Sequence, residues 1–142
     1  MNAIHRLRSL DRGLRRVLLR ALWLVLLIRI GLWILPSRTL HRAVAARALR
    51  RRIRRPHSVE QITWAVTAAA RRVPQATCLT QALAAMVLLA ANGHPATLRF
   101  GVAISAGGGL RAHAWIDSGE KTILADPRSD SLVAFPPIAF RR

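Results

Sequence analysis

Cysteine is nearly absent from this sequence, which contains only Cys78 among 142 residues. A single thiol cannot form an internal disulfide, so we expect no disulfide-stapled secreted scaffold and a reducing, cytoplasmic location. No group of Cys and His has metal-ligand spacing, so neither a metal nor another cofactor is expected. The length suits one domain, residues 1–142, and is too short for a catalytic domain joined to a separate recognition domain.

Acidic residues and lysine are also scarce. Six Asp and Glu stand against 23 basic residues, and Lys121 is the only lysine, so the net charge is +17. Residues 1–72 carry most of this charge (net +15), and residues 73–142 carry little (net +2). The asymmetry fits an acidic partner or a membrane surface, but a solvated basic surface is the simpler interpretation. We expect no nucleic-acid binding, because no aromatic residues interleave with the basic ones and no groove-reading motif is present.

The sequence also lacks an uninterrupted apolar run of about 20 residues, the length that a membrane-spanning helix needs. The most hydrophobic segment, residues 14–35, contains Arg29 near its middle and ends at Pro36, which predicts a helix stopped by proline. A central arginine costs roughly 2.5 to 3.5 kcal/mol on insertion, so a buried core helix is favoured over membrane contact. A signal peptide is disfavoured because no A-x-A-like cleavage site follows.

Two further helices are predicted before residue 73. Residues 37–55 alternate small apolar residues with Arg as an amphipathic helix does, and Pro56 ends it; its expected buried stripe is Ala43, Val44, Ala46 and Leu49. Ser58 then begins a capping box with Gln61, which predicts a helix from Val59 to about Arg71. Apolar residues at helical spacing mark its buried face: Ile62, Ala65, Val66 and Ala69.

The second half of the chain changes in character. Residues 79–91 predict a buried helix that Asn92-Gly93 closes, with Cys78 at its start. Strands are predicted over residues 96–104, 110–117 and 122–126. Helices followed by an antiparallel sheet indicate an α+β fold.

Cys78 stands where a catalytic thiol would be placed. A thiol attacks as thiolate, and a helix N-terminus, with Thr77 as the expected N-cap, supplies partial positive charge and free N–H groups. These N–H groups, that of Cys78 foremost, are expected to bind the oxyanion of a tetrahedral intermediate, with Gln75 as a further side-chain donor. Taken alone, Cys78 is better explained as a small buried hydrophobic residue.

His113 and a following aspartate favour the catalytic interpretation. Asp117 lies on the same strand as His113, about 13 Å away at roughly 3.3 Å per residue, which is too far for a hydrogen bond. If the hairpin turns at Gly119-Glu120, paired residues have numbers that sum to 239, and His113 faces Asp126. Opposed side chains on one sheet face are close enough for the carboxylate to orient the imidazole. A slip of one residue would put them on opposite faces.

Three stretches of the second half carry a resemblance to a known family. They are Cys78-Leu79 at the start of the Ala- and Leu-rich helix, Asn92-Gly93-His94 before a strand that ends in Phe100-Gly101-Val102, and Ala112-His113-Ala114-Trp115. Over about residues 74–127 the chain resembles the stand-alone leader peptidase of lasso-peptide biosynthesis. Members of that family are bacterial cysteine proteases with a papain-like, transglutaminase-like core.

This resemblance implies a function and a set of partners. It implies that Cys78, His113 and Asp126 form a triad that cuts the leader from a ribosomally made precursor peptide. It also implies a separate leader-recognition protein and a macrolactam-forming cyclase that acts on the product. Residues 1–72 would form a basic helical part and residues 73–142 the catalytic core.

Two alternative functions stay open. The same triad could transfer the acyl group to an amine, as transglutaminases do, or the chain could be a non-enzymatic basic protein that associates with membranes. Trp115 is a candidate wall of the substrate site, because it lies two residues from His113 on the same strand face, although a large apolar residue on a strand is more often part of the core.

Overall fold

The computed structural model describes residues 11–50, 56–104, 107–124 and 133–135, with the side chains of residues 37–50 described in part. Helices come first in the chain and strands follow, which confirms the predicted α+β class. The helices are α2 (Arg12–Ile34), α3 (Ser37–Arg50), α4 (Val59–Ala70) and α5 (Cys78–Ala91). The strands are β1 (Thr97–Ile104), β2 (Leu110–Ser118), β3 (Lys121–Ile123) and β4 (Val133–Ala134).

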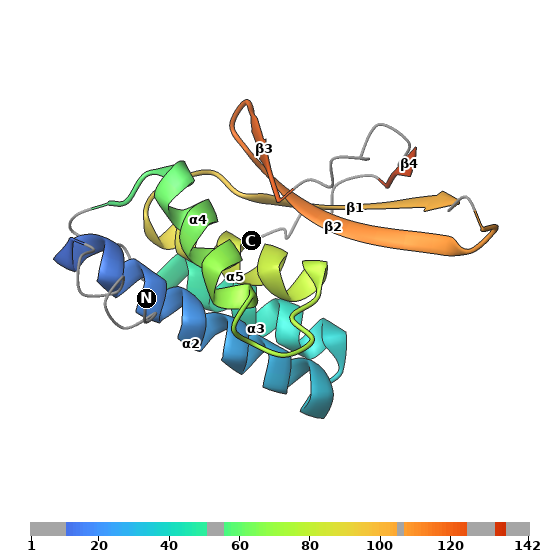
Figure 1. Cartoon of the computed structure of the whole chain (residues 1–142), viewed down its shortest axis with the longest axis horizontal. Helices are drawn as coiled ribbons and strands as arrows, with labels where there is room; N and C mark the ends of the chain where they lie inside the picture. Colours follow the sequence, from blue (N-terminus) through green and yellow to red (C-terminus); the bar gives the residue numbers. More distant parts are fainter. Residues whose placement is uncertain (1–10, 51–55, 105–106, 125–132, 136–142) are drawn as a thin grey trace, which may run out of the picture.

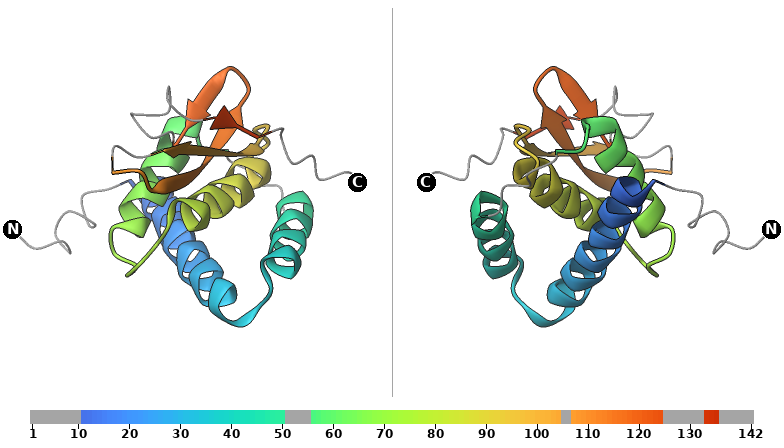
Figure 2. Two further views of the ribbon diagram at one scale, coloured as in Figure 1. Left: turned by 90° about the vertical axis from the view of Figure 1, so that its right-hand side faces the viewer. Right: turned by 90° about the vertical axis from the view of Figure 1, so that its left-hand side faces the viewer.

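The helices form one layer beneath a small antiparallel sheet (Figures 1 and 2). The strand order is β3-β2-β1-β4, so the long β1–β2 hairpin lies in the middle of the sheet. Helix α5 is central, because it contacts the other three described helices on its sides and both β1 and β2 above. Its residues 82–89 are all buried, so the helix that begins at Cys78 is held by the core on every side.

Helix α2 buries only one of its two apolar faces. Asp11 caps its N-terminus by accepting a hydrogen bond from Gly13 N, and the helix ends just before Pro36, as predicted. The buried face is Val17, Leu18, Ala21, Val25 and Ile28. The opposite face is apolar too, yet exposed, so the expectation of a core helix holds for one side of α2 only.

The stripe predicted for α3 is confirmed at Val44 and wrong at Ala43 and Ala46. Leu40 and Val44 are buried, whereas Ala43 and Ala46 are exposed. The physical reason is size, because α3 docks through its larger side chains at i and i+4, and Leu40 lies against the bare backbone of Gly31 on α2. The predicted continuation over residues 51–55 and the side chain of Leu49 lie outside the described residues.

Both capping predictions are confirmed. Ser58 Oγ accepts from Gln61 N, and Gln61 Oε1 accepts from Ser58 N, so α4 begins with a complete capping box. Thr77 Oγ1 accepts from Thr80 N at 3.3 Å at the start of α5. The predicted buried face of α4 is observed in full: Ile62, Ala65, Val66 and Ala69.

The register of the second hairpin is also confirmed. Ile116 pairs with Ile123 and Ser118 with Lys121, so the residue numbers sum to 239 and Gly119 occupies the turn with φ of +62°. The third strand, predicted over residues 122–126, is observed over Lys121–Ile123, and Leu124 adopts φ of +59°; residues 125 and 126 lie outside the described residues. This left-handed conformation is uncommon outside glycine and takes the chain out of the sheet.

An exposed ion pair fastens β3 to α4. Lys121 Nζ donates to Glu60 Oε1, and this bond is the largest of the effects that lower the pKa of Glu60 to about 2; the backbone N–H of Glu60 and the Ser58 hydroxyl contribute further. The edge strand β3, which pairs with the strand that carries His113, is therefore linked to helix α4.

Candidate active site

Cys78 is the first residue of α5 and is only partly buried. Within the first turn, Thr80 N is taken by the Thr77 cap and Gln81 N by the Thr77 carbonyl. Among the described residues, the backbone N–H groups of Cys78 and Leu79 have no hydrogen-bond partner. Two donors at the positive end of a helix thus stand beside the thiol, which is the arrangement expected of an oxyanion site.

His113 lies on β2, where it pairs with Gly101 of β1. Its Nε2 is 2.9 Å from the carbonyl oxygen of Leu124. A carbonyl can only accept, so in this contact Nε2 carries the proton and donates it. In the neutral imidazole Nδ1 is then the unprotonated nitrogen, which is the form that can take a proton from a thiol.

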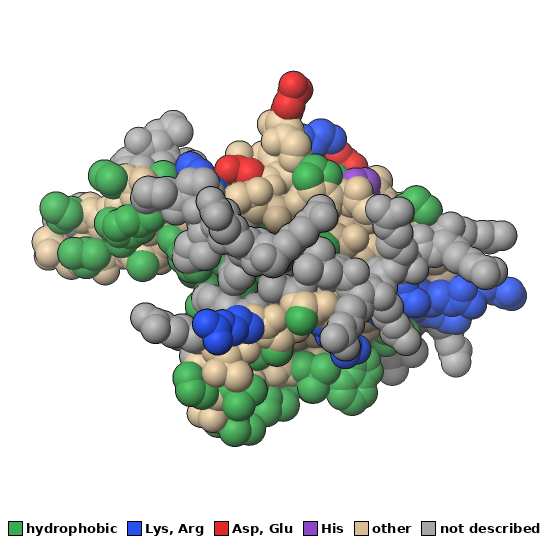
Figure 3. All heavy atoms as spheres, turned by 180° about the vertical axis from the view of Figure 1, so that it is seen from behind, with side chains coloured by type: hydrophobic (Ala, Val, Ile, Leu, Met, Phe, Trp, Pro, Cys, Tyr) green, Lys and Arg blue, Asp and Glu red, His purple; other side chains and the backbone are tan. Residues whose placement is uncertain are grey.

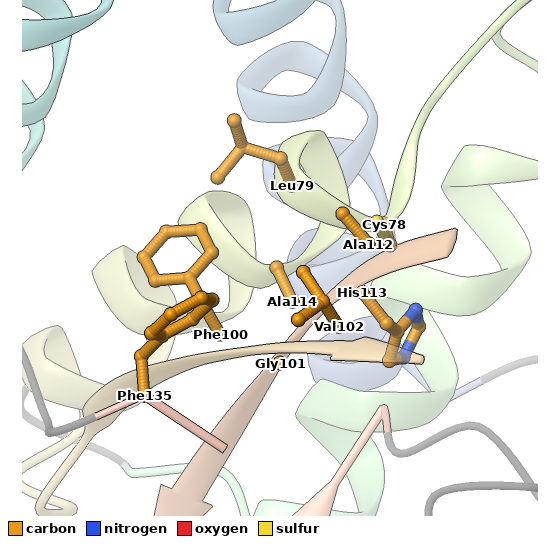
Figure 4. A pocket seen from close by; sticks show the side chains of 9 residues that line it. All are labelled: Cys78, Leu79, Phe100, Gly101, Val102, Ala112, His113, Ala114 and Phe135. Atoms are coloured by element: carbon orange, nitrogen blue, oxygen red, sulfur yellow. The ribbon is translucent and has the colours of Figure 1, made fainter. Parts of the chain in front are cut away.

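Cys78 and His113 line the same pocket, which has a volume of about 500 Å³. Figure 4 shows both residues at one end of it and two phenylalanines at the other end; Ala112 points toward α5, whereas the His113 ring lies on the opposite face of β2. Apart from Cys78 and His113 the lining is apolar or glycine: Leu79, Phe100, Gly101, Val102, Ala112, Ala114 and Phe135. Among the described residues Cys78 Sγ makes no hydrogen bond, and such contacts often close only when substrate binds.

The Gln75 side chain faces α2 rather than the pocket. Its Oε1 accepts a hydrogen bond of 2.5 Å from Arg29, and the residue is exposed with φ of +56°. Gln75 does not line the pocket that Cys78 and His113 share. Its predicted role as an oxyanion donor therefore stays a prediction, and its observed role is to link the loop before Cys78 to α2.

Trp115 is buried and stacks beside His113, with ring centroids 6.3 Å apart and planes inclined by 14°. The two residues share a face of β2, as their spacing predicts, whereas Ala114 between them faces α5 and the core. Trp115 is not part of the pocket lining. Its predicted contact with substrate stays a prediction, and in this structure it supports the imidazole from the side.

Gly101 makes this support possible. A Cβ built on Gly101 would come within 2.9 Å of the Trp115 ring and 3.2 Å of the Val133 carbonyl of β4. Glycine therefore lets the tryptophan lie flat against β1, directly across from His113.

Replacing Gly101 with alanine is expected to destabilise the protein. Gly101→Ala forces Trp115 or β4 to move, which costs about 1 to 3 kcal/mol in the free energy of unfolding, as overpacking generally does. Urea unfolding followed by tryptophan fluorescence measures this. The matched control is Gly107→Ala, which meets nothing within 4 Å and should stay within about 0.5 kcal/mol of the parent. Equal stability of the two variants would contradict the tight packing at Gly101.

Asp117 and Asp126 are the two carboxylates considered as partners of the His113 imidazole. Asp117 pairs with Arg99 at 3.6 Å and accepts a hydrogen bond from the Thr122 hydroxyl, so its carboxylate is engaged away from His113, as expected from its place on the strand. Asp126 lies outside the described residues, and its predicted role is not tested. Among the described residues the pairing of β2 with β3 runs as far as Ile123, in the register from which Asp126 was predicted.

Sequence reasoning missed the Leu124 carbonyl and most of the pocket. A backbone carbonyl has no sequence signal, and nothing about a leucine predicts a left-handed conformation. The pocket wall had a usable signal, because the β1–β2 pairing sets Phe100 opposite Ala114 and Val102 opposite Ala112 on the face toward α5. The two predicted strands and their short loop would have given this register.

Comparison of the sequence with known protein families gives one match, which covers most of the chain. The model of one family, described as the transglutaminase-like superfamily, matches residues 22–139. No significant match was found among curated proteins or solved structures.

Proposed function

Because the chain belongs to the transglutaminase-like superfamily, which includes cysteine peptidases and acyl transferases, we propose that it is a cysteine peptidase that removes the leader from a lasso-peptide precursor. One observation carries the proposal: Cys78 at the start of a buried helix and His113 on the sheet packed against that helix line one pocket. The more specific substrate rests on the resemblance of residues 74–127 to the leader peptidases.

The proposed reaction begins with the thiol. The His113 ring, which lies on the face of β2 away from α5 in this structure, first turns toward Cys78. His113 Nδ1 then takes the proton of Cys78, and Sγ forms a bond to the scissile carbonyl carbon while the N–H groups of Cys78 and Leu79 bind the oxyanion. The C–N bond then breaks, and His113 gives its proton to the amine of the departing core peptide. Water next attacks the thioester with His113 as base, which frees the leader as a carboxylic acid and restores the thiol.

In this proposal two groups hold the imidazole. The Leu124 carbonyl accepts from Nε2, and the ring lies beside Trp115. Asp126 remains the proposed third member of the triad. A carboxylate near the ring would stabilise the imidazolium that forms after proton transfer, which a neutral carbonyl does less well.

The pocket chemistry suits a small apolar or mixed side chain next to the scissile bond. Apart from Cys78 and His113, every lining residue is apolar or glycine, and Ala112 and Ala114 leave room near the reacting pair. Such a pocket selects one side chain and not a whole leader sequence. The proposal therefore includes a separate recognition protein that presents the leader, and a cyclase that uses the newly exposed amine of the core.

Product mass separates the proposed function from acyl transfer. We expect that the chain, mixed with the recognition protein and a precursor encoded beside its gene, releases a leader that has gained the mass of one water. Acyl transfer would instead give a leader that carries the added amine. Mass spectrometry with hydroxylamine present as competing nucleophile distinguishes the two. A predominantly hydroxamate product would favour the transferase.

A further inference from the structure

Helix α2 has an exposed apolar face that the proposed chemistry does not use. At 3.6 residues per turn its large exposed side chains form a stripe about 120° wide, directly opposite the buried face. Two tryptophans dominate it, Trp23 at 62% and Trp33 at 75% exposure. The stripe also includes Leu27, Ile30 and Ile34, and Leu35 follows where the chain turns toward α3.

The N-terminal end of this face of α2 is basic, and exposed arginines also lie on α3. Arg15, Arg16 and Arg20 are exposed on the first turns of α2, and Arg42 and Arg47 are exposed on α3. The sequence has no acidic residue between Asp11 and Glu60. Figure 3 shows hydrophobic side chains gathered along the lower edge of the molecule, at the end of α2, with basic groups at the opposite end.

We propose that this face of α2 binds the surface of an anionic lipid membrane. Exposed tryptophans beside aliphatic side chains match the interfacial layer of a bilayer, where an aromatic ring has one apolar side and one wet side. The exposed arginines at the N-terminal end of this face match anionic headgroups, and each basic residue near such a surface adds to the attraction. The C-terminal half of α2 lies in the interface, and the arginines of its first turns contact the headgroups.

The attachment is peripheral and does not cross the membrane. By length and composition α2 is apolar enough to span a bilayer. However, its buried face packs on α4 and α5, and Arg29 is bonded to Gln75 in the loop that leads to Cys78. A spanning helix would expose that core and break this link, whereas a helix in the plane of the interface leaves both intact.

The distribution of charge favours lipid over a protein on this face. A second copy packed on this face would bring its own excess of arginine near that of the first, and like charges at close range repel. A protein partner would need acidic groups beside an apolar ridge. An anionic bilayer offers a continuous negative surface above an apolar layer, so its headgroups suit the arginines and its apolar layer suits the hydrophobic stripe.

Vesicle sedimentation of the full chain tests the proposal. The protein is expected to bind vesicles of phosphatidylcholine with phosphatidylglycerol, and to bind phosphatidylcholine alone far more weakly. The variant Trp23→Ser/Trp33→Ser is expected to lower the partition coefficient on the anionic vesicles about tenfold or more, because it removes two large apolar side chains from the contact. The matched control is Trp64→Ser, an exposed tryptophan on α4 that lies in a groove against β3.

Several results would overturn the proposal. The chain could remain in solution with both kinds of vesicle, bind them equally, or bind anionic vesicles as well after the double substitution as before. A concentration-dependent dimer that the double variant abolishes, without vesicle binding, would assign the face to a second copy instead. Circular dichroism and the unfolding midpoint show that each variant is folded, which is expected because these side chains are exposed.

Discussion

Cys78→Ala is expected to abolish cleavage of the precursor peptide, with a fall in kcat/KM of at least about 10⁴-fold. The reason is that alanine leaves the pocket, the helix N-terminus and His113 in place but removes the atom that forms the bond to the scissile carbonyl. Time courses of leader release, followed by mass spectrometry in the presence of the recognition protein, measure the effect. Trimming by Cys78→Ala at a rate near that of the parent would show that the assignment of the nucleophile is wrong.

The single cysteine makes a second measurement specific. Because Cys78 is the only thiol, iodoacetamide labelling of the whole protein reports on this residue alone. We expect rapid labelling of the folded protein at neutral pH and a parallel loss of activity. A thiol that reacts only after unfolding would support the non-enzymatic interpretation instead. Cys78→Ser serves as the conservative variant, since it keeps a polar group at the helix start, and we expect it to fold but not to cleave.

Local signals predicted the elements that position the nucleophile. The Ser58 capping box, the Thr77 cap and the end of α5 at Asn92-Gly93 each depend on a few neighbouring residues, so the sequence contains all that is needed. The register of the β2–β3 hairpin belongs to the same class, because a two-residue turn at Gly119 fixes it. These local features set Cys78 at the start of its helix and His113 on its strand.

The parts that sequence analysis missed depend on tertiary packing. The α3 stripe was right at Val44 but wrong at Ala43 and Ala46, because the helix that α3 packs against determines which of its residues are buried, and Leu40 fits over Gly31. The contact of His113 with the Leu124 carbonyl depends on the left-handed backbone conformation of Leu124, which the sequence does not predict. In α2 the apolar residues signalled a buried helix, but composition alone does not tell a core face from an exposed one. The role of Asp126 remains a prediction for a residue outside the described part of the chain.

His113→Gln is expected to reduce kcat/KM about 10²- to 10⁴-fold, through loss of the proton acceptor for Cys78 and the proton donor for the leaving amine. The control is His94→Gln. His94 is also half-buried, and its Nε2 also lies close to a backbone carbonyl, that of His57 at 2.8 Å, but it does not line the pocket. The two substitutions thus remove similar side chains with similar hydrogen bonds, and a merely structural role would give similar losses for both.

The pH dependence separates the two roles further. If His113 acts as base and acid, His113→Gln should remove from the pH profile of kcat/KM the ionisation that belongs to the imidazole, and His94→Gln should leave the profile unchanged in shape. His113→Gln should also slow the alkylation of Cys78 at neutral pH, since the thiol loses its proton acceptor. Nearly full activity in His113→Gln, or an equal loss in His94→Gln, would remove His113 from the reaction.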